Sequence, residues 1–516
     1  MIRGYMMRRT ILTILFILGI FICTLDTTIL NVSLPNIGEH LDVGLDSLSW
    51  ALNVYLILFA SLTIPLTRIS EMLGVHKCFL IGVFLFGIGS TLSALSSELS
   101  MLLVGRAIQS VGASIVFPLS MTLGIGLVNV EKRTGMTAIL GITQGLAAAL
   151  GPTIGGIVTQ FMGWRWIFWI NVPLTIIMIL IGITNLNMRN EVQHKQSMDI
   201  LGAILIVVTL ATLSLGMMRG RVWTWTSFAT VLCFLTSAVS FSLFVWIEHR
   251  SKNPMVPLQL FSDRNFSVSS GVIIFSNLFL VATTVILPSY FTNIAGFDSF
   301  HSSLLISPIS LAILIFSPIS GFAQARVNAK WLILIRFIVM ASGYMWLAFG
   351  ALMSQMQTIL AGFAIGMGYG IITGPILIIA AGSLEGKLLA ASQSVTGVLR
   401  QVGSMLAVAI FVTGLYSNLS VAKTASKTYA HHQIVKLHLP DKEQENVINK
   451  INTNTNTTKF VKANINDVPI ILKHSIQNIE NNTNIELRKS FENLYLASLP
   501  FLLLSAIIGF FLKSKK

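Results

Sequence analysis

The feature that most constrains this chain is a series of long apolar runs, each about as long as a helix that crosses a bilayer. A spanning helix takes about 20 predominantly apolar residues, and we count fourteen such runs. Because lipid offers no hydrogen-bond partners to the backbone, each run is expected to be helical. The predicted spans are 10–31, 47–67, 78–97, 101–128, 136–161, 165–186, 199–218, 226–247, 266–290, 301–321, 331–352, 355–379, 389–416 and 492–512.

Composition supports a polytopic membrane protein rather than a soluble domain with one anchor. Only 10% of residues are charged and the mean hydropathy is +0.78, whereas a soluble domain carries about 25% charged residues. The first run lacks a small-residue cleavage site, so we expect no cleaved signal peptide. Cys23, Cys78 and Cys233 have neither metal-ligand nor disulfide spacing, and we expect no metal site and no cofactor.

The distribution of basic residues predicts how the chain is oriented. The net charge is +14, but Lys and Arg are spread over many short loops, which fits membrane topology better than nucleic-acid binding. With the N-terminus inside, nearly all the positive charge of the short loops falls on the inner side. We therefore expect a multi-pass protein of the cytoplasmic membrane with both termini in the cytoplasm, and no nucleic-acid partner.

An internal repeat predicts two related halves. Residues 103–118 (LVGRAIQSVGASIVFP) and 360–375 (LAGFAIGMGYGIITGP) coincide at Leu, Gly, Ala, two Ile and Pro; chance similarity of two Gly/Ala/Ile-rich helices is the alternative. These are the fourth and twelfth runs, as expected for two six-helix halves separated by two helices, and duplicated halves are typical of secondary transporters. The predicted units are an N-terminal half at 1–186, two inserted helices with linkers at 187–265, a C-terminal half at 266–512 and a tail at 513–516.

One outer connection, residues 417–490, is long, polar and rich in Asn and Thr. We expect it to be a partly disordered surface loop outside the cell. Leu and Ile spacing around residues 465–489 leaves short amphipathic helices as the alternative.

Asp26 is unusual because it lies inside the first apolar run. A carboxylate at bilayer depth costs at least about 3 kcal/mol, and burial disfavours its charged form, so such a group can hold a proton near neutral pH. We interpret Asp26 as a proton carrier, with Thr27 and Asn31 beside it on a polar stripe. A structural Asp hydrogen-bonded to a neighbouring helix is the alternative.

Arg106, in the fourth run, needs a carboxylate or carbonyl partner inside the membrane. Asp26 is the deep acid available, so we expect the two groups to interact and their charge balance to change when the proton leaves. Packing of Arg106 on backbone carbonyls is the alternative. The repeat has Phe363 at the equivalent position, which confines the pair to the N-terminal half. The polar residues assigned to the lining of a central substrate cavity are Thr27, Asn31, Gln109, Gln144, Arg400 and Gln401.

The fifth run contains GITQGLAAALGPTIGG at residues 141–156. Glycines at this spacing let helices approach closely, and proline removes a backbone hydrogen bond and permits a kink. Such a helix suits a moving interface between halves, with static close packing as the alternative. The residues assigned to this interface are Gly141, Gly145, Gly151, Pro152, Gly155 and Gly156.

The short loop TRISEMLGVHK, residues 67–77, contains one acid among several bases. Ion pairs and helix-dipole contacts there can hold helix ends together; an ordinary positively charged inner loop is an equal alternative. The candidate latch residues are Arg68, Glu71, Gly74 and Lys77. The Trp-rich block GWRWIFWINVP at 163–173 is interpreted as an interfacial aromatic anchor.

Together these blocks resemble the major facilitator superfamily, most closely its fourteen-helix drug:proton antiporter branch. LDTTILNVSLP looks like the family's LDxTxxNxxLP motif, which places the family's acid at Asp26. GRAIQSVG is similar to the RxxQGxG motif, with Ser110 and Val111 where the pattern differs slightly, and places the functional Arg at Arg106. The fifth run resembles GxxxGPxxGG, which marks exporters in the family.

The resemblance covers residues 10–416 and 492–512, and includes the Trp-rich block and RQVG at 400–403, both similar to elements of the branch. The 67–77 loop departs from the family pattern GxLADRxGRK, which alters the ion-pair network that the resemblance implies. The departures are Thr67, Ser70, Glu71 and Met72, where Gly, Ala, Asp and Arg are expected. Apart from Glu492 at the first position of the last span, the predicted helices of the C-terminal half contain no acid, which favours monovalent cationic or neutral amphiphiles over divalent cations as substrates.

The sequence and the resemblance therefore predict an all-α major facilitator fold and a monomeric, proton-coupled exporter of lipophilic, cationic drugs that works by alternating access. Its partners would be small-molecule substrates, protons and the bilayer. No GxxxxGK[ST] motif occurs, so the proton gradient is the expected energy source. The alternatives are a dedicated exporter of one metabolite, lipid or signalling molecule, and a non-transporting sensor or scaffold. Enzyme activity is not expected, because neither HExxH nor GxSxG occurs.

Overall fold

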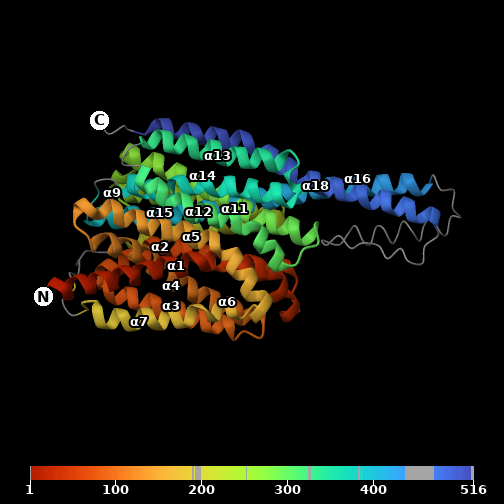
Figure 1. Cartoon of the computed structure of the whole chain (residues 1–516). Coiled ribbons are helices and arrows are strands. Elements are labelled where there is room, and N and C mark those ends of the chain that lie inside the picture. Colours follow the sequence, from red (N-terminus) through yellow and green to blue (C-terminus); the bar gives the residue numbers. More distant parts are fainter. Residues whose placement is uncertain are drawn as a thin grey trace.

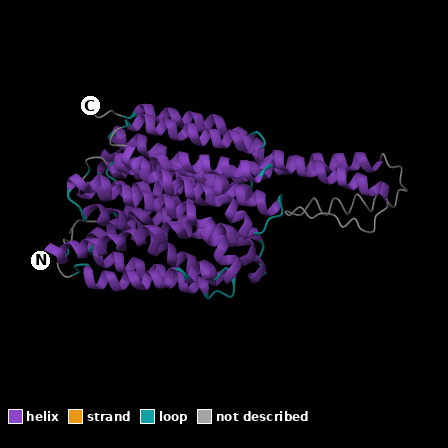
Figure 2. Cartoon of the chain, viewed as in Figure 1, coloured by secondary structure: helices purple, strands orange, loops and turns teal. Residues whose placement is uncertain are grey.

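The computed structural model describes residues 2–188, 191, 199–251, 253–323, 327–381, 384, 386–435 and 470–512. These residues are almost entirely helical and contain no strand (Figure 2). Among them, fourteen helices are long and apolar enough to cross a membrane. The predicted all-α polytopic fold and the number of spans are confirmed.

The helices follow the order of the apolar runs. The first six spans are α1 (Ile2–Leu41), α2 (Leu45–Leu73), α3 (Val75–Ala94), α4 (Leu99–Gly126), α5 (Val130–Met162), and α6 (Trp166–Trp169) together with α7 (Asn171–Asn185). The inserted spans are α8 (Ile200–Trp223) and α9 (Phe228–Arg250), followed by the short α10 (Gln259–Ser262). The last six are α11 (Arg264–Asn293), α12 (Ser299–Ala323), α13 (Ala329–Ala348), α14 (Gln355–Ala381), α15 (Gly386–Ala407) continued by the π-helical turn η2 (Val408–Val412) and α16 (Thr413–Val435), and α18 (Ile470–Ile507). The 3₁₀ turns are η1 (Ala351–Met353) and η3 (Ile508–Phe511).

Several helices begin where a side chain can satisfy the free amides of the first turn. Asp199 accepts a hydrogen bond from the Gly202 amide at 2.8 Å and begins α8. Asp263 accepts from the Asn265 and Phe266 amides at 2.7 and 2.9 Å and begins α11. Such caps are worth about 1 kcal/mol each. They place the helix starts where short polar loops interrupt the apolar runs.

The helices pack as two similar groups that face one another. In the first group α4 packs on α3 and contacts α1, and in the second α14 packs on α13 and contacts α11, as the repeat predicts for equivalent helices. The groups meet where α5 packs on α12 and α14, and where α2 packs on α15. The inserted α8 lies against α2 and α15, and α9 packs mainly on α8. The residue boundaries of the predicted units remain predictions.

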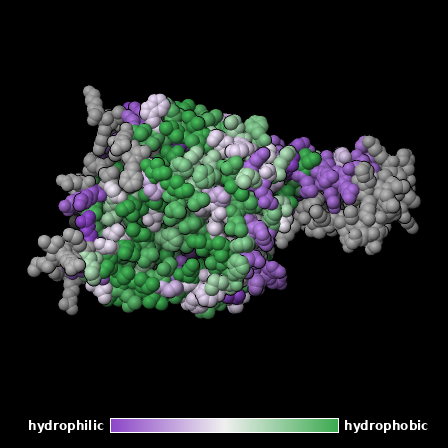
Figure 3. All heavy atoms as spheres, in the orientation of Figure 1, coloured by the Kyte–Doolittle hydropathy of each residue, from purple (hydrophilic) through white to green (hydrophobic). Residues whose placement is uncertain are grey.

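The apolar surface forms a broad belt over the bundle, and polar residues gather on the projection at one side (Figure 3). The first helix begins, and the last helix ends, on the side of the bundle away from that projection (Figure 1). The chain is therefore a multi-pass membrane protein whose described ends share one side.

The prediction of a partly disordered loop at residues 417–490 is wrong for the described parts of this segment. Residues 417–435 belong to α16 and residues 470–490 to α18, and these two helices pack on each other as they extend beyond the bundle (Figure 1). The Asn418 side-chain amide donates to the Ser490 carbonyl oxygen at 3.0 Å, and Ala430, Ile434 and Ile479 form a small apolar cluster. Contacts between the two helices explain why polar sequence is helical here. Residues 436–469 lie outside the described part of the chain.

Candidate functional site

Asp26 lies in the interior of the first helix group, in direct contact with Arg106. Each side chain has 1% or less of its surface exposed. Arg106 Nη1 donates to Asp26 Oδ2 at 2.5 Å and to Gln109 Oε1 at 2.8 Å. Gln109 Nε2 donates to Asp26 Oδ1 at 2.8 Å. The three side chains close a triangle in which both carboxylate oxygens accept a hydrogen bond.

A second layer of groups holds this triangle. Arg106 Nε donates to the Ala51 carbonyl oxygen of α2 at 3.0 Å, and its guanidinium lies 4.2 Å from the centre of the Tyr55 ring. Ser90 of α3 accepts hydrogen bonds from Gln109 at 3.3 Å and from Asn171 of α7 at 3.0 Å. The buried pair is therefore supported by three other helices, α2, α3 and α7, as a membrane-embedded charge requires.

The close approach of α3 and α4 explains how Ser90 reaches Gln109. A Cβ built on Gly89 would overlap the backbone nitrogen of Gln109, and one built on Gly112 would lie 2.5 Å from the Phe86 nitrogen. Only glycine permits this spacing of the two backbones. The Trp-rich block supplies Asn171, so it contributes to the Asp26 environment. Its signal in the sequence is an Asn inside an otherwise apolar run.

A small central cavity lies between the two helix groups. Its volume is about 30 Å³, close to that of one water molecule. Four of the six expected polar lining residues contribute to its wall: Thr27, Gln144, Arg400 and Gln401. The remaining lining residues are Thr24, Thr28, Phe59, Phe117, Ala148, Asn277, Val281, Gly397 and Ser404. Because drug-sized pockets are about 300–1,000 Å³, the cavity is closed in this conformation.

The predicted polar stripe on α1 is divided between two environments. Asp26 points towards α4 and binds Gln109, which therefore lies in the Asp26 network and is absent from the cavity lining. Thr27 faces the cavity, while Asn31 is half-buried and outside that lining. Consecutive residues on a helix point about 100° apart, which separates Asp26 from Thr27.

The glycine-rich helix α5 contacts both helix groups. A Cβ on Gly151 would overlap the Thr28 side chain, and one on Gly155 would overlap the Ile29 carbonyl oxygen, both on α1. At the other end, a Cβ on Gly141 would lie 2.9 Å from Leu377 Cδ1 and one on Gly145 would lie 2.9 Å from Thr373 Cγ2, both on α14. Pro152 and Gly156 are buried in the same helix. The Pro152 carbonyl oxygen accepts a hydrogen bond from Ser303 of α12 at 3.2 Å.

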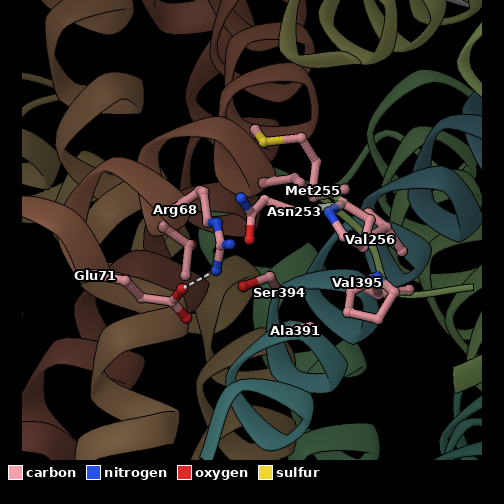
Figure 4. A pocket seen from close by; sticks show the side chains of 12 residues that line it. Arg68, Glu71, Asn253, Met255, Val256, Ala391, Ser394 and Val395 are labelled. Carbon is pink, nitrogen blue, oxygen red and sulfur yellow. Dashed lines mark hydrogen bonds and ion pairs between the residues drawn. The ribbon is translucent and has the colours of Figure 1, made fainter. Parts of the chain in front are cut away.

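The predicted latch loop connects three parts of the chain. Arg68 and Glu71 form an ion pair at 2.7 Å, beside a cavity of about 200 Å³. The linker residues Asn253, Met255 and Val256 and the α15 residues Ala391, Ser394 and Val395 surround this pair (Figure 4). The predicted loop is therefore wrong in extent, because residues 67–73 belong to α2, residues 75–77 belong to α3 and only Gly74 separates these helices. The ion pair lies in the last turns of α2 and faces α15, where the helix groups meet.

Glu191, in the linker after α7, contacts the segment of the predicted latch and could not be identified from the sequence. Its Oε1 accepts from the His76 amide at 2.6 Å and lies 3.0 Å from His76 Nδ1. Gly74 has a φ of +116° and leaves no room for a Cβ beside the Glu191 carboxylate, so glycine is required there. Lys77 is exposed. No local pattern could have identified Glu191, because it lies more than a hundred residues from its partner.

Outside the spans, Asp298 caps the start of α12. The His301 amide and imidazole both bind its Oδ1 at 2.7 Å, and these contacts hold the pKa of Asp298 below its usual value.

Residues 16–408 match the family model of the Major Facilitator Superfamily. The chain is 27% identical over 404 residues to the multidrug resistance protein Stp of Mycobacterium tuberculosis, covering 78% of this chain and 75% of that protein. It is 29% identical over 414 residues to the multidrug export protein EmrB of Escherichia coli, covering 78% and 79% respectively. It is also 31% identical over 337 residues to the probable multidrug resistance protein EmrY of Escherichia coli, with 65% of each chain covered.

Proposed function

The chain belongs to the Major Facilitator Superfamily, and on that premise we propose that it is a proton-coupled exporter of lipophilic drugs or toxic compounds. The relatives Stp and EmrB carry the names of multidrug resistance and export proteins, which supports efflux as the direction. In this proposal the protein acts as a transporter rather than an enzyme, as a monomer, with both termini in the cytoplasm. Its substrates are small molecules and its driving ion is the proton.

The observation that carries the proposal is the arrangement around one turn of α1, residues 24–29. Asp26 points away from the cavity and pairs with Arg106. Thr27, the next residue, lines the central cavity. Thr28 and Ile29 lie against the glycines of α5. The proton site, the cavity wall and the contact with α5, the helix that packs on the second group, therefore share one rigid segment.

This arrangement supplies a mechanism for coupling. When Asp26 takes up a proton, its ion pair with Arg106 is lost and the guanidinium keeps only the amide oxygen of Gln109 and a backbone carbonyl. Removing one charge from a buried pair is worth several kcal/mol (about 3–5). That energy is applied to the α1 turn, which can shift against α5 where Gly151 and Gly155 carry no side chain. The protonated and deprotonated forms then favour different openings of the cavity.

The test is dye efflux in energised everted vesicles, with ethidium and a neutral lipophilic dye. We expect accumulation that a protonophore abolishes and that Asp26→Asn abolishes while the protein remains in the membrane. Asp298→Asn, an exposed acid outside the spans, is the matched control and should transport normally. Persistent transport in Asp26→Asn would move the proton site elsewhere. Transport of a single compound would favour a dedicated exporter, and no dye accumulation together with no substrate-induced proton movement would favour a non-transporting sensor or scaffold.

A further inference from the structure

The two helix groups differ in their balance of buried charge. In the first group Arg106 is neutralised by Asp26. Between residues 264 and 435 the sequence has only two acids, Asp298 and Glu385. Asp298 is an exposed cap, and Glu385 lies outside the described residues. This region nevertheless buries two arginines in its spans, one in α13 and one in α15.

Arg400 of α15 is the arginine that reaches the central cavity. Its side chain is 8% exposed and belongs to the cavity wall. Its Nη1 donates to the Tyr369 hydroxyl at 3.1 Å, and its buried Nε has no hydrogen-bond partner. The Tyr369 hydroxyl donates a hydrogen bond to the side-chain oxygen of Asn277 at 3.4 Å, because an amide oxygen only accepts. The guanidinium therefore contacts a neutral acceptor and no carboxylate among the described residues.

Arg336 of α13 also lies close to Tyr369. It is 1% exposed, and its Nε and Nη2 have no hydrogen-bond partner. Its guanidinium carbon lies 5.3 Å from the centre of the Tyr369 ring and 5.0 Å from that of Phe337. Ring faces stabilise a cation by only about 1–2 kcal/mol. Tyr369 thus contacts two buried cations without neutralising either.

Unpaired buried charge in a membrane protein marks a substrate or ion path. Arg106, by comparison, donates hydrogen bonds to a carboxylate, an amide oxygen and a backbone carbonyl oxygen. Arg336 and Arg400 together leave three donor nitrogens unused. Guanidinium groups match carboxylate, sulfonate and phosphate oxygens in geometry as well as charge. The missing partner is an anion.

We propose that Arg400, backed by Arg336, binds the anionic group of the transported compound, so that the preferred substrates are lipophilic organic anions. Phe59, Phe117 and Val281 of the cavity wall supply an apolar surface for the rest of such a molecule, once the cavity opens. The amides of Gln144 and Gln401 rotate to donate or accept and favour neither charge. The inference rests on the proposed export function and replaces the preference for cations that the sequence suggested.

The experiment uses two probes of the same shape and opposite permanent charge, radiolabelled naphthalenesulfonate and naphthyltrimethylammonium. Initial rates of uptake are measured in everted vesicles containing the full chain, with and without an imposed proton gradient. We expect the wild type to accumulate the sulfonate at least about tenfold faster than the ammonium ion, the effect of one charge-assisted hydrogen bond. This comparison needs no variant and is therefore independent of folding defects.

Two variants then assign the effect to Arg400. Arg400→Gln should lower sulfonate uptake about tenfold or more, while Arg400→Lys, which keeps the charge, should retain most of it. Gradient-driven uptake of the ammonium ion in preference to the sulfonate would overturn the inference and leave the export function standing. Equal sulfonate uptake in wild type and folded Arg400→Gln would overturn it as well. Uptake of neither probe, together with no dye transport, would refute the export function itself.

Discussion

Replacing Asp26 with Asn should damage the protein more than the loss of one charge suggests. Both oxygens of Asp26 accept hydrogen bonds, from Arg106 at 2.5 Å and from Gln109 at 2.8 Å. Asn offers one acceptor and one donor, so one of these contacts becomes donor against donor. Gln109 cannot simply turn over, because its oxygen accepts from Arg106.

The size of the effect follows from burial. Leaving a buried charge without its partner costs about 3–5 kcal/mol, and an unmatched buried donor adds about 1–3 kcal/mol. We therefore expect Asp26→Asn to lower the unfolding free energy by about 4 kcal/mol or more. Arg106→Gln should cost less, because the carboxyl left behind can take up a proton and become neutral. The double variant contains no buried charge at this site.

A double-mutant cycle measures this coupling. Unfolding in mixed micelles with increasing dodecyl sulfate, followed by tryptophan fluorescence, gives relative stabilities for the wild type, both single variants and the double variant. We expect the double variant to be more stable than the sum of the single effects predicts, by about 2 kcal/mol. Effects of Asp26 and Arg106 that add within about 0.5 kcal/mol would refute the reasoning that the two charges depend on each other.

Three further changes test other parts of the structure. Gly155→Ala should slow transport and lower stability by about 1–3 kcal/mol, because the added Cβ would overlap an α1 carbonyl oxygen. The control is Gly135→Ala on the same helix, whose Cβ would meet nothing within 4 Å. This variant should keep normal transport and stability. Gly74→Ala, at φ +116°, should expose the linker after α7 to limited proteolysis without reducing membrane insertion; unchanged cleavage would contradict the latch geometry. Asp298 has a lowered pKa, so its stabilisation of α12 is present above its unfolded pKa of about 3.9 and is lost as pH falls through the lower folded value. Asp298→Asn should remove that acid-dependent part of stability, as measured by thermal unfolding between pH 5 and pH 2, and His301→Ala should reduce it.

The fold and the Asp26–Arg106 contact could be predicted because lipid leaves few solutions. Backbone amides in a bilayer must be satisfied within each run, so run length alone identifies the helices. Two opposite charges buried in the same set of spans satisfy each other better than any apolar neighbour does, so their contact follows. The presence of Gln144, Arg400 and Gln401 at the cavity has the same origin, since polar groups avoid the lipid face.

Helix rotation and long-range contacts could not be predicted. Many of these helices are apolar on nearly every side, so their sequences carry little information about which face points inward. Gln109 was expected in the cavity and lies beside Asp26 instead. The same rule that identified Arg106 applies to Arg336, a charge inside an apolar run, but its partner Tyr369 carries no charge to signal the contact. The helical projection of α16 and α18 depends on pairing between segments that are separated by 34 undescribed residues, 436–469.

The charge of the substrate has a consequence for energetics that gives a final prediction. If one proton enters per cycle, export of a monovalent cation moves no net charge, whereas export of a monovalent anion moves two positive charges inward. Each elementary charge is worth about 2.3 kcal/mol per 100 mV, so the membrane potential would contribute about 4.6 kcal/mol per 100 mV to anion export. In everted vesicles held at constant pH gradient, valinomycin with equal potassium on both sides should therefore sharply reduce naphthalenesulfonate accumulation. If sulfonate uptake did not depend on the membrane potential, the exchange of one sulfonate ion for one proton moving in the opposite direction would be refuted. The transport cycle would then have to combine protons and sulfonate in a ratio other than one inward proton per exported anion.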